Sequence, residues 1–255
     1  MLLVIDVGNT NTVIGVYDND ILVHDWRIRT IKDTTADEFN ILANALFTDS
    51  GIERRAIKKI VISSVVPSAV AILDAFCRKY LDLAPLWVNP DMVKKLMPIL
   101  YSNPNEVGPD RIVNAIAAFD KYKTALIIID FGTATTFDII SQKGEYLGGA
   151  IVPGIMISAE ALFHRASRLP RVEIFKAPEK VIGKDTINSI KSGIIYGNAA
   201  MVDGMIQRIS SEMKTKPKVL ATGGLAPLIS SVSDSIEKVE SSLTLEGLRI
   251  ISAGI

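Results

Sequence analysis

The feature that most constrains the fold of this chain is a strand-and-turn pattern that occurs twice. In each copy an apolar run ends at Asp-x-Gly, passes through small polar residues and resumes as an alternating apolar run, first at Asp6–Gly8 and again at Asp130–Gly132. A shift of 124 positions superimposes the copies and places Thr12 on Thr136. One such match is common by chance, whereas two matches half a chain apart indicate an internal duplication.

Each turn combines the residue types that a phosphate site uses. Glycine removes the Cβ that keeps a ligand from the backbone, threonine hydroxyls and turn N–H groups can donate to anionic oxygens, and a strand-end aspartate can hold a cation or water. The structural alternative is an ordinary hairpin with an Asx turn. Because this alternative has to hold twice, at Asp6 and at Asp130, the repeat favours the phosphate site.

The composition predicts a globular protein with two buried cores. Of the 255 residues, 48% are hydrophobic and 22% are charged. Lysine plus arginine equals aspartate plus glutamate at 28 each, so no basic excess drives nucleic-acid binding and no nucleic-acid partner is expected. No apolar run reaches the length of a membrane span and the first strand starts without a basic leader, so we expect no membrane association and a cytoplasmic location.

Other common sites are not indicated. Cys77 lies among apolar residues at helical spacing, which predicts a buried thiol, and His24 and His164 are too far apart in sequence to indicate a zinc site. The P-loop and the strand-linked G-x-G-x-x-G signature are both absent from the sequence. A bound phosphate would therefore be held in another way.

Hydrophobic periodicity predicts an α/β protein. The first copy is expected to run βββαβαβ, with strands at 2–7, 12–17 and 21–29, a helix from the capping box Thr35-x-x-Glu38 to Gly51, a strand at 59–63, a helix from Pro67 and a strand at 85–88. A proline-rich segment, 89–109, is expected to connect the copies. The second copy is expected to have a helix from Pro109, strands at 125–130, 135–141 and 145–152, helices at 155–163, 186–196 and 198–213, a strand at 218–221, a helix at 225–229, and a last helix or loop at 243–254.

Five motifs, in this order, resemble those of type III pantothenate kinases, within the superfamily of acetate and sugar kinases, Hsp70 and actin. They are Asp6–Thr10, Gly108–Arg111, Asp130–Thr136, Gly148–Gly154 and Ala221–Gly224. The resemblance covers essentially the whole chain. It implies a duplicated ribonuclease-H-like (actin-like ATPase) fold, with two βββαβαβα-type domains at 1–108 and 109–255 and an ATP cleft between them.

The resemblance also implies the reaction, which is transfer of a phosphoryl group from ATP to pantothenate, the first step of coenzyme A biosynthesis. It implies that Asp130 holds a monovalent cation, potassium or ammonium, and that magnesium accompanies ATP, with Asp6 a candidate to contact it. The implied ATP-binding residues are Asp6, Val7, Gly8, Asn9, Thr10, Asn11, Thr12, Val13, Thr133, Gly223 and Gly224. The implied pantothenate-binding residues are Tyr101, Gly108, Pro109, Asp110, Arg111 and Thr186, the last from the partner subunit of a homodimer.

Each proposed role has a structural alternative. Asp110 is the expected general base, but a carboxylate after Pro109 could equally be a cap or first-turn group that stabilises the helix dipole. Arg111 is expected to bind the pantothenate carboxylate, against the alternative of a solvated surface arginine. Thr186 could be a helix N-cap, a role that Asp185 could also take. Gly223 and Gly224 could form a ligand-free turn, and Tyr101 a half-buried aromatic contact.

Two other functions compete with a kinase. One is hydrolysis of ATP or polyphosphate with no organic acceptor, and Tyr101 with Gly108–Arg111 argues against it because a hydrolase needs no acceptor site. The other is a catalytically silent, nucleotide-binding regulatory protein of the Bvg accessory factor type. The presence of Asp6, Asp110 and Asp130 together disfavours this second alternative.

Overall fold

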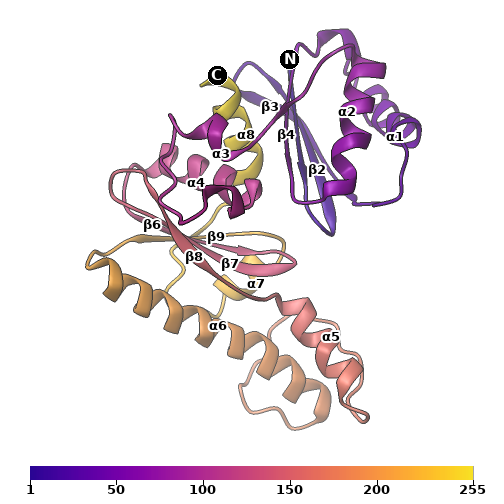
Figure 1. Ribbon diagram of the computed structural model, residues 1–255. Coiled ribbons are helices and arrows are strands. Elements are labelled where there is room, and N and C mark those ends of the chain that lie inside the picture. Colours follow the sequence, from indigo (N-terminus) through magenta and orange to yellow (C-terminus); the bar gives the residue numbers. More distant parts are fainter. Residues whose placement is uncertain (255) are drawn as a thin grey trace. The chain divides into compact units, whose positions relative to one another are not determined.

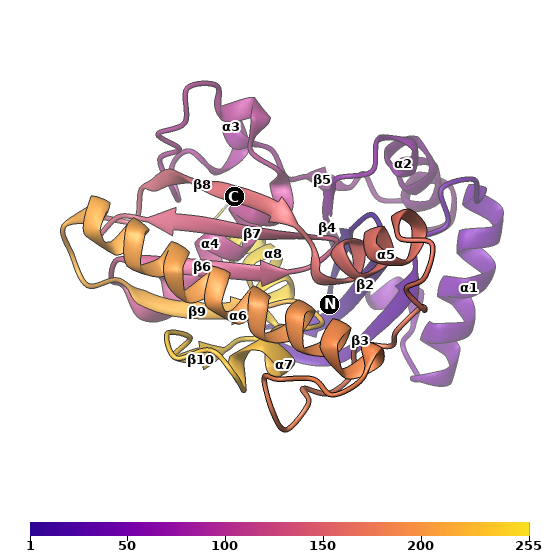
Figure 2. The same ribbon diagram turned by 90° about the horizontal axis from the view of Figure 1, so that it is seen from below.

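The computed structural model describes residues 1–254 and divides into two compact units (Figures 1 and 2). The first unit contains Met1–Asp120 together with the C-terminal residues from Leu243, and the second contains Lys121–Ser242. The C-terminal helix therefore belongs to the first unit. The predicted domain boundary between residues 108 and 109 stays a prediction, because a compact unit need not be a domain that folds alone.

The first unit is built on a five-stranded mixed sheet of strand order β3-β2-β1-β4-β5. Its elements are β1 (Leu2–Val7), β2 (Asn11–Asp18), β3 (Ile21–Arg29), α1 (Ala36–Asp49), the 3-10 helix η1 (Arg54–Ala56), β4 (Lys59–Ser64), α2 (Pro67–Leu81), β5 (Leu86–Trp87), α3 (Pro90–Val93), the 3-10 helix η2 (Pro104–Glu106), α4 (Pro109–Tyr122) and the C-terminal α8 (Leu243–Ala253). The predicted order βββαβαβ is confirmed, and the undecided C-terminal segment is a helix.

Local signals set the ends of the first helices. The Thr35 hydroxyl accepts from the Glu38 N–H at 3.2 Å, and the Glu38 carboxylate accepts from the Thr35 N–H at 2.8 Å, so the predicted capping box is present. Helix α2 begins with Pro67, as predicted, and after α1 Gly51 adopts a left-handed φ of +67°. These signals determine where α1 and α2 begin and where α1 ends.

The segment predicted to be a plain connection contains two short helices. The Asn89 side chain accepts from the Met92 N–H at 3.0 Å and Pro90 occupies the first turn, which is sufficient to form α3. The Asn103 side chain likewise accepts from the Asn105 N–H at the start of η2. The sequence predicted a connecting segment here but not these two helices, because the prolines were counted as breakers and the asparagine caps before them were overlooked.

The second unit has a five-stranded sheet of order β10-β9-β6-β7-β8. Its elements are β6 (Leu126–Phe131), β7 (Ala134–Ile140), β8 (Tyr146–Pro153), α5 (Ile155–Arg165), α6 (Thr186–Met213), β9 (Lys218–Thr222), α7 (Ala226–Ser230) and β10 (Lys238–Val239). Read from β8 to β10, this order matches the first sheet read from β3 to β5. The short edge strand β10 was not predicted.

The pairing registers of the two sheets correspond in detail. Asp6 on β1 pairs with Ser63 on β4, and Asp130 on β6 pairs with Thr222 on β9. Each sheet also has an irregularity at the same place, between Val16 and Tyr17 in the first and between Ile139 and Ile140 in the second. A shared β-bulge supports the internal duplication, because an extra residue in one strand is a local feature that topology does not require.

The pairing also corrects the alignment of the two turns. Val7 pairs with Thr12 in the first sheet, and Phe131 pairs with Thr135 in the second. The counterpart of Thr12 is therefore Thr135, and the predicted match with Thr136 was wrong. The first turn is one residue longer, because four residues lie between Val7 and Thr12 whereas three lie between Phe131 and Thr135.

Helix α6 is continuous over 28 residues, although the sequence predicted two helices that meet near Gly197. Its buried residues continue on both sides of that glycine, from Ile194 and Ile195 to Ala199 and Val202. A glycine inside a helix costs about 1 kcal/mol relative to alanine, and the burial of this apolar stripe outweighs that cost.

Each unit has its own core. In the first, the alternate β1 residues Leu3, Ile5 and Val7 join a buried cluster with residues of α1 and α2, and α8 contacts the strands β1, β2 and β4. In the second, α6 covers the apolar residues of β6 and β9 (Figure 2). Within residues 1–254 no helix combines the length and the apolar character needed to cross a membrane.

Candidate active site

The turn between β1 and β2 is held by Thr30, the residue that follows β3. The Thr30 hydroxyl donates to the Gly8 carbonyl at 2.8 Å, and the Thr30 N–H donates to the Thr10 carbonyl at 3.0 Å. The hydroxyls of Thr12 and Thr30 are hydrogen-bonded at 2.9 Å. Thr30 was not among the predicted site residues, although the hairpin register between β2 and β3 would have placed it beside the turn.

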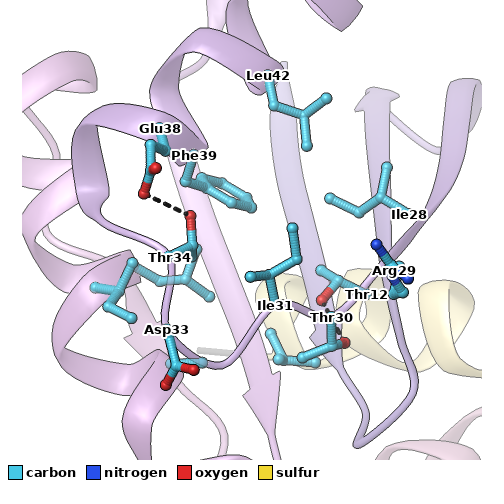
Figure 3. A pocket seen from close by; sticks show the side chains of 14 residues that line it. Thr12, Ile28, Arg29, Thr30, Ile31, Asp33, Thr34, Glu38, Phe39 and Leu42 are labelled. Carbon is cyan, nitrogen blue, oxygen red and sulfur yellow. Dashed lines mark hydrogen bonds between the residues drawn. The ribbon is translucent and has the colours of Figure 1, made fainter.

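A pocket of about 280 Å³ lies beside this turn (Figure 3). Val7, Thr12 and Thr30 form one wall, and side chains of α1 and α2, including Phe39 and Leu73, form another. The remaining lining residues are Ile28, Arg29, Ile31, Asp33, Thr34, Glu38, Leu42, Ala69 and Ile72. None of the residues implied for pantothenate lines this pocket, so it is separate from the predicted acceptor site.

The turn between β6 and β7 is surrounded by glycines. A Cβ on Gly154 would lie 2.0 Å from the Thr133 carbonyl oxygen, and a Cβ on Gly223 would lie 2.4 Å from Asp130 Oδ1. Gly223 also has a φ of +92°, a conformation that side chains rarely adopt. Both glycines are therefore required by the close approach of their backbone to the turn.

Gly224 differs from its neighbour. A Cβ added there would meet no atom of the described residues within 4 Å. Gly223 is thus explained by packing against Asp130, whereas Gly224 faces open space before α7. The predicted place of both residues near adenosine stays a prediction.

Several polar atoms of the two strand-end regions are buried. Asp6 Oδ1 is buried, and so are Ser63 Oγ on the paired strand β4 and Thr135 Oγ1 at the second turn. Within residues 1–254, the two hydroxyls have no hydrogen-bond partner. A buried hydroxyl that makes no hydrogen bond lowers the stability of the fold. These two hydroxyls therefore indicate that the strand ends have a role other than stability.

Asp110 is the second residue of α4, and its carboxylate is fixed by the helix start. Asp110 Oδ1 accepts from the Arg111 N–H at 2.8 Å, and a Cβ on Gly108 would lie 2.5 Å from the same oxygen. Burial raises the pKa of the Asp110 carboxyl, and the Arg111 N–H and guanidinium only partly oppose this shift. A carboxyl with a raised pKa is a better proton acceptor than an ordinary aspartate.

Arg111 is buried, with 8% of its surface exposed. The alternative of a solvated surface arginine is therefore wrong. A buried guanidinium two residues after Pro109 can present a planar fork of donors to a carboxylate. This geometry suits the recognition of an anionic acceptor.

The remaining predicted residues lie apart along the chain. Tyr101 is half-buried in the segment before η2, and Thr186 is exposed as the first residue of α6. The N-cap of α6 is Asp185, whose carboxylate accepts from the Asn188 N–H at 2.8 Å. The capping role that was open between Thr186 and Asp185 thus belongs to Asp185.

The donor atoms at Asp130 suit a cation. The space that a Cβ on Gly223 would fill lies next to Asp130 Oδ1 and, at 2.7 Å, the Phe131 carbonyl oxygen. Carboxylate and carbonyl oxygens are the ligands that potassium and magnesium prefer. No group of three or more His, Cys, Asp and Glu side chains within residues 1–254 is placed to hold a metal ion, so further ligands would be carbonyls, water or phosphate oxygens.

Two mixed five-stranded sheets of one topology, each with an Asp-x-Gly turn, define the class of actin-like ATPase folds. Solved structures agree with this fold. A Campylobacter jejuni protein assigned to the Baf family of transcriptional activators has a TM-score of 0.59 at 18% identity, covering 99% of this chain and 98% of its own. Component A of (R)-2-hydroxyglutaryl-CoA dehydratase from Acidaminococcus fermentans has a TM-score of 0.58 at 12% identity, covering 97% of this chain and 94% of its own.

Sequence comparison narrows the class to one family. The family model of type III pantothenate kinases matches residues 2–208. The type III pantothenate kinase of Desulforapulum autotrophicum is 69% identical over 252 residues, which cover 99% of this chain and 96% of the relative. The chain belongs to the type III pantothenate kinase family.

Proposed function

We propose that this protein transfers the terminal phosphoryl group of ATP to the hydroxyl of pantothenate, which yields 4′-phosphopantothenate and ADP. Membership of the family supports the reaction. The structural observation that carries the proposal is Asp110, a carboxylate with a raised pKa at the start of α4, next to a buried arginine. Hydrolysis alone would require neither an acceptor-binding arginine nor a base for an alcohol.

In this mechanism Asp110 accepts the proton of the pantothenate hydroxyl as that oxygen attacks phosphorus. Phosphoryl transfer depends mainly on positioning and on charge stabilisation, so a base that is fixed in place contributes by orienting the nucleophile. The hydrogen bond from the Arg111 N–H occupies one lobe of the carboxylate and Gly108 leaves room for it. The acceptor site would be completed by Tyr101 and by the Arg111 guanidinium, which binds the pantothenate carboxylate.

The nucleotide is assigned to the two turns. Turn N–H groups between Asp6 and Val13, together with Thr133, would bind its phosphates, and Gly223 and Gly224 would lie near the adenosine. Magnesium would arrive with ATP, with Asp6 as the candidate carboxylate to contact it, and Asp130 would hold potassium or ammonium. Bound cations would neutralise charge that develops on the phosphates.

We propose that the protein forms a homodimer through a surface of its second unit. Large apolar side chains are exposed along α5, the segment that leads to α6 and the first turn of α6, and exposed apolar groups in such number are typical of interaction sites. They are Met156, Ile157, Leu162, Phe163, Phe175, Val181, Ile182 and Ile187. Thr186 lies within this stretch, which supports its proposed contact with pantothenate bound by a partner subunit.

The test is a coupled assay of ADP release with pantothenate, with pantetheine and without an acceptor, each in the presence and absence of potassium. The proposal predicts release that requires pantothenate and potassium. Release without an acceptor would contradict the proposal in favour of a hydrolase. ATP binding without release would favour the regulatory alternative.

A further inference from the structure

The position of Thr30 has a consequence for how the first turn can bind phosphate. Thr30, which follows β3, donates two hydrogen bonds to the turn. Its hydroxyl donates to the Gly8 carbonyl, and its backbone N–H donates to the Thr10 carbonyl. We propose that Thr30 is a positioning residue that orients the β1–β2 turn for the phosphates of ATP. This proposal rests on the proposed function, because it concerns the same turn.

The hydrogen bond from Thr30 fixes the orientation of the peptide group between Gly8 and Asn9. The peptide bonds of residues 1–254 are all trans, and in a planar trans peptide the C=O and the N–H point in opposite directions. Because the Gly8 carbonyl is held by the Thr30 hydroxyl at 2.8 Å, the Asn9 N–H of the same peptide points away from Thr30. A backbone N–H directed out of a glycine-containing turn is a suitable donor to a phosphate oxygen.

The hydroxyl protons of Thr12 and Thr30 are both used in hydrogen bonds within this region. A threonine hydroxyl has one hydrogen to donate, and that of Thr30 goes to the Gly8 carbonyl. Thr12 must therefore be the donor in its 2.9 Å hydrogen bond with Thr30. The Thr12 hydroxyl thus donates to Thr30 (Figure 3), and the Thr30 hydroxyl donates to the Gly8 carbonyl, so the Thr12 hydroxyl has no proton left for phosphate. The Asn9 N–H, which points away from Thr30, is a donor that remains.

The second copy supports this assignment by contrast. Pairing of β7 with β8 makes Gly154 the counterpart of Thr30, because Pro153 pairs with Ala134 as Arg29 pairs with Asn11. A Cβ on Gly154 would lie 3.0 Å from the Gly132 carbonyl oxygen and 2.0 Å from that of Thr133. Thr30 and Gly154 therefore occupy equivalent positions next to equivalent carbonyls in the two copies. Only the first copy has a hydroxyl at this position.

The test compares Thr30→Val, which removes the hydroxyl at nearly constant volume, with Thr30→Ser, which retains it. Thr34→Val is a matched control, because Thr34 lines the same pocket and its hydroxyl bonds to Thr35 and Glu38 rather than to the turn. Calorimetry gives the Kd of ATP without an acceptor, steady-state kinetics give both KM values, and thermal unfolding reports stability.

We expect Thr30→Val to raise the Kd and KM of ATP about tenfold and to leave the pantothenate KM within about twofold, while Thr30→Ser and Thr34→Val keep the wild-type Kd of ATP. An unchanged Kd of ATP in Thr30→Val would overturn the proposal, whether or not the Tm falls, and so would equal losses in Thr30→Val and Thr30→Ser. If Thr30→Val does not fold, Thr30→Ala takes its place with the same expected result. A wild-type protein that binds ATP but does not phosphorylate pantothenate would overturn the proposed function alone.

Discussion

In the first copy of the repeated pattern a side chain lies against the turn, whereas in the second copy the backbone itself does. Thr30 reaches the Gly8 carbonyl through its hydroxyl, and at the corresponding position Gly154 lets the chain approach the Thr133 carbonyl directly. The first turn is also one residue longer, since Asn9 has no counterpart in the second. The longer turn is hydrogen-bonded from one side, and the shorter turn is enclosed by glycines next to Asp130.

The sheets also differ further from the turns, but there the glycine is in the first copy and the polar side chain in the second. In the first sheet Gly15 packs against α8, where a Cβ would lie 3.1 Å from Leu245. Its counterpart in the second sheet is Asp138, a fully buried carboxylate that accepts from the Tyr146 hydroxyl at 2.7 Å. Duplication has thus kept the strand order and the pairing register, while the residues at equivalent positions have diverged and give each copy its own chemistry.

The largest effect is expected at Asp110, which lies in the first unit and is the proposed base for the pantothenate hydroxyl. Asp110→Asn should lower kcat by a factor of roughly 10² to 10⁴, because a positioned general base contributes about that much, while the Kd of ATP is unchanged. Burial raises the pKa of Asp110, so the wild-type rate should fall as the pH drops through a pKa above the ordinary aspartate value of about 3.9, where the base becomes protonated. Near-normal turnover of Asp110→Asn would show that another group accepts the proton.

The dependence of the second turn on glycine is tested by a pair of neighbours. Gly223→Ala should lower the free energy of unfolding by about 3 kcal/mol, because it combines a φ of +92° with a Cβ 2.4 Å from Asp130 Oδ1. The matched control is Gly224→Ala, where no described atom lies within 4 Å of the new Cβ and little change is expected. Denaturant unfolding measures both. Equal stability of the two variants would contradict the packing described for Asp130.

The buried pair that distinguishes the second sheet is tested by Tyr146→Phe. Removal of the hydroxyl takes away a hydrogen bond to a carboxylate that is 0% exposed, which should cost about 2 kcal/mol of unfolding free energy. Chemical denaturation with an unchanged m-value would measure this loss. A variant as stable as the wild type would mean that Asp138 is satisfied without Tyr146.

The smallest effect is expected at Ser63, which pairs with Asp6 and is buried without a hydrogen-bond partner among the described residues. Ser63→Ala removes an unsatisfied group, so the free energy of unfolding should change by no more than about 0.5 kcal/mol, or rise. Thermal unfolding without ligands is the measurement. A loss above about 1 kcal/mol would reveal a partner of the hydroxyl that the folded chain supplies.

Hydrophobic periodicity and local turn signals predicted most of the helices and strands along the chain, and the family resemblance implied the duplicated fold. They could not reveal the extra residue at Asn9, since a constant shift ignores which residues pair across a hairpin. The break placed at Gly197 was wrong because helix propensity is local, whereas the buried stripe of α6 is a tertiary feature. Thr30 was overlooked because its contact is also a tertiary feature. Its hydroxyl reaches the Gly8 carbonyl only once β3 has paired beside the first turn.

Some features of the candidate site could be predicted from the sequence, and others could not. The position of Asp110 at a helix start followed from Pro109, but the burial that raises its pKa depends on the packing around α4. The need for glycine at residues 154 and 223 was not foreseen, because it arises from close approaches between segments far apart in sequence. Short-range signals such as caps and turns were therefore predictable, and contacts across the sheet were not.

The proposal gives Asp6 a role in binding magnesium-ATP and Asp130 a role in binding potassium. The most direct test is a potassium titration of the initial rate, with wild type, Asp6→Asn and Asp130→Asn measured in parallel. We predict that Asp130→Asn loses the activation by potassium, whereas Asp6→Asn remains activated but needs a higher concentration of magnesium-ATP. Retained activation in Asp130→Asn, or its loss in Asp6→Asn with no change for magnesium-ATP, would contradict the assignment of potassium to Asp130 and of magnesium-ATP to Asp6.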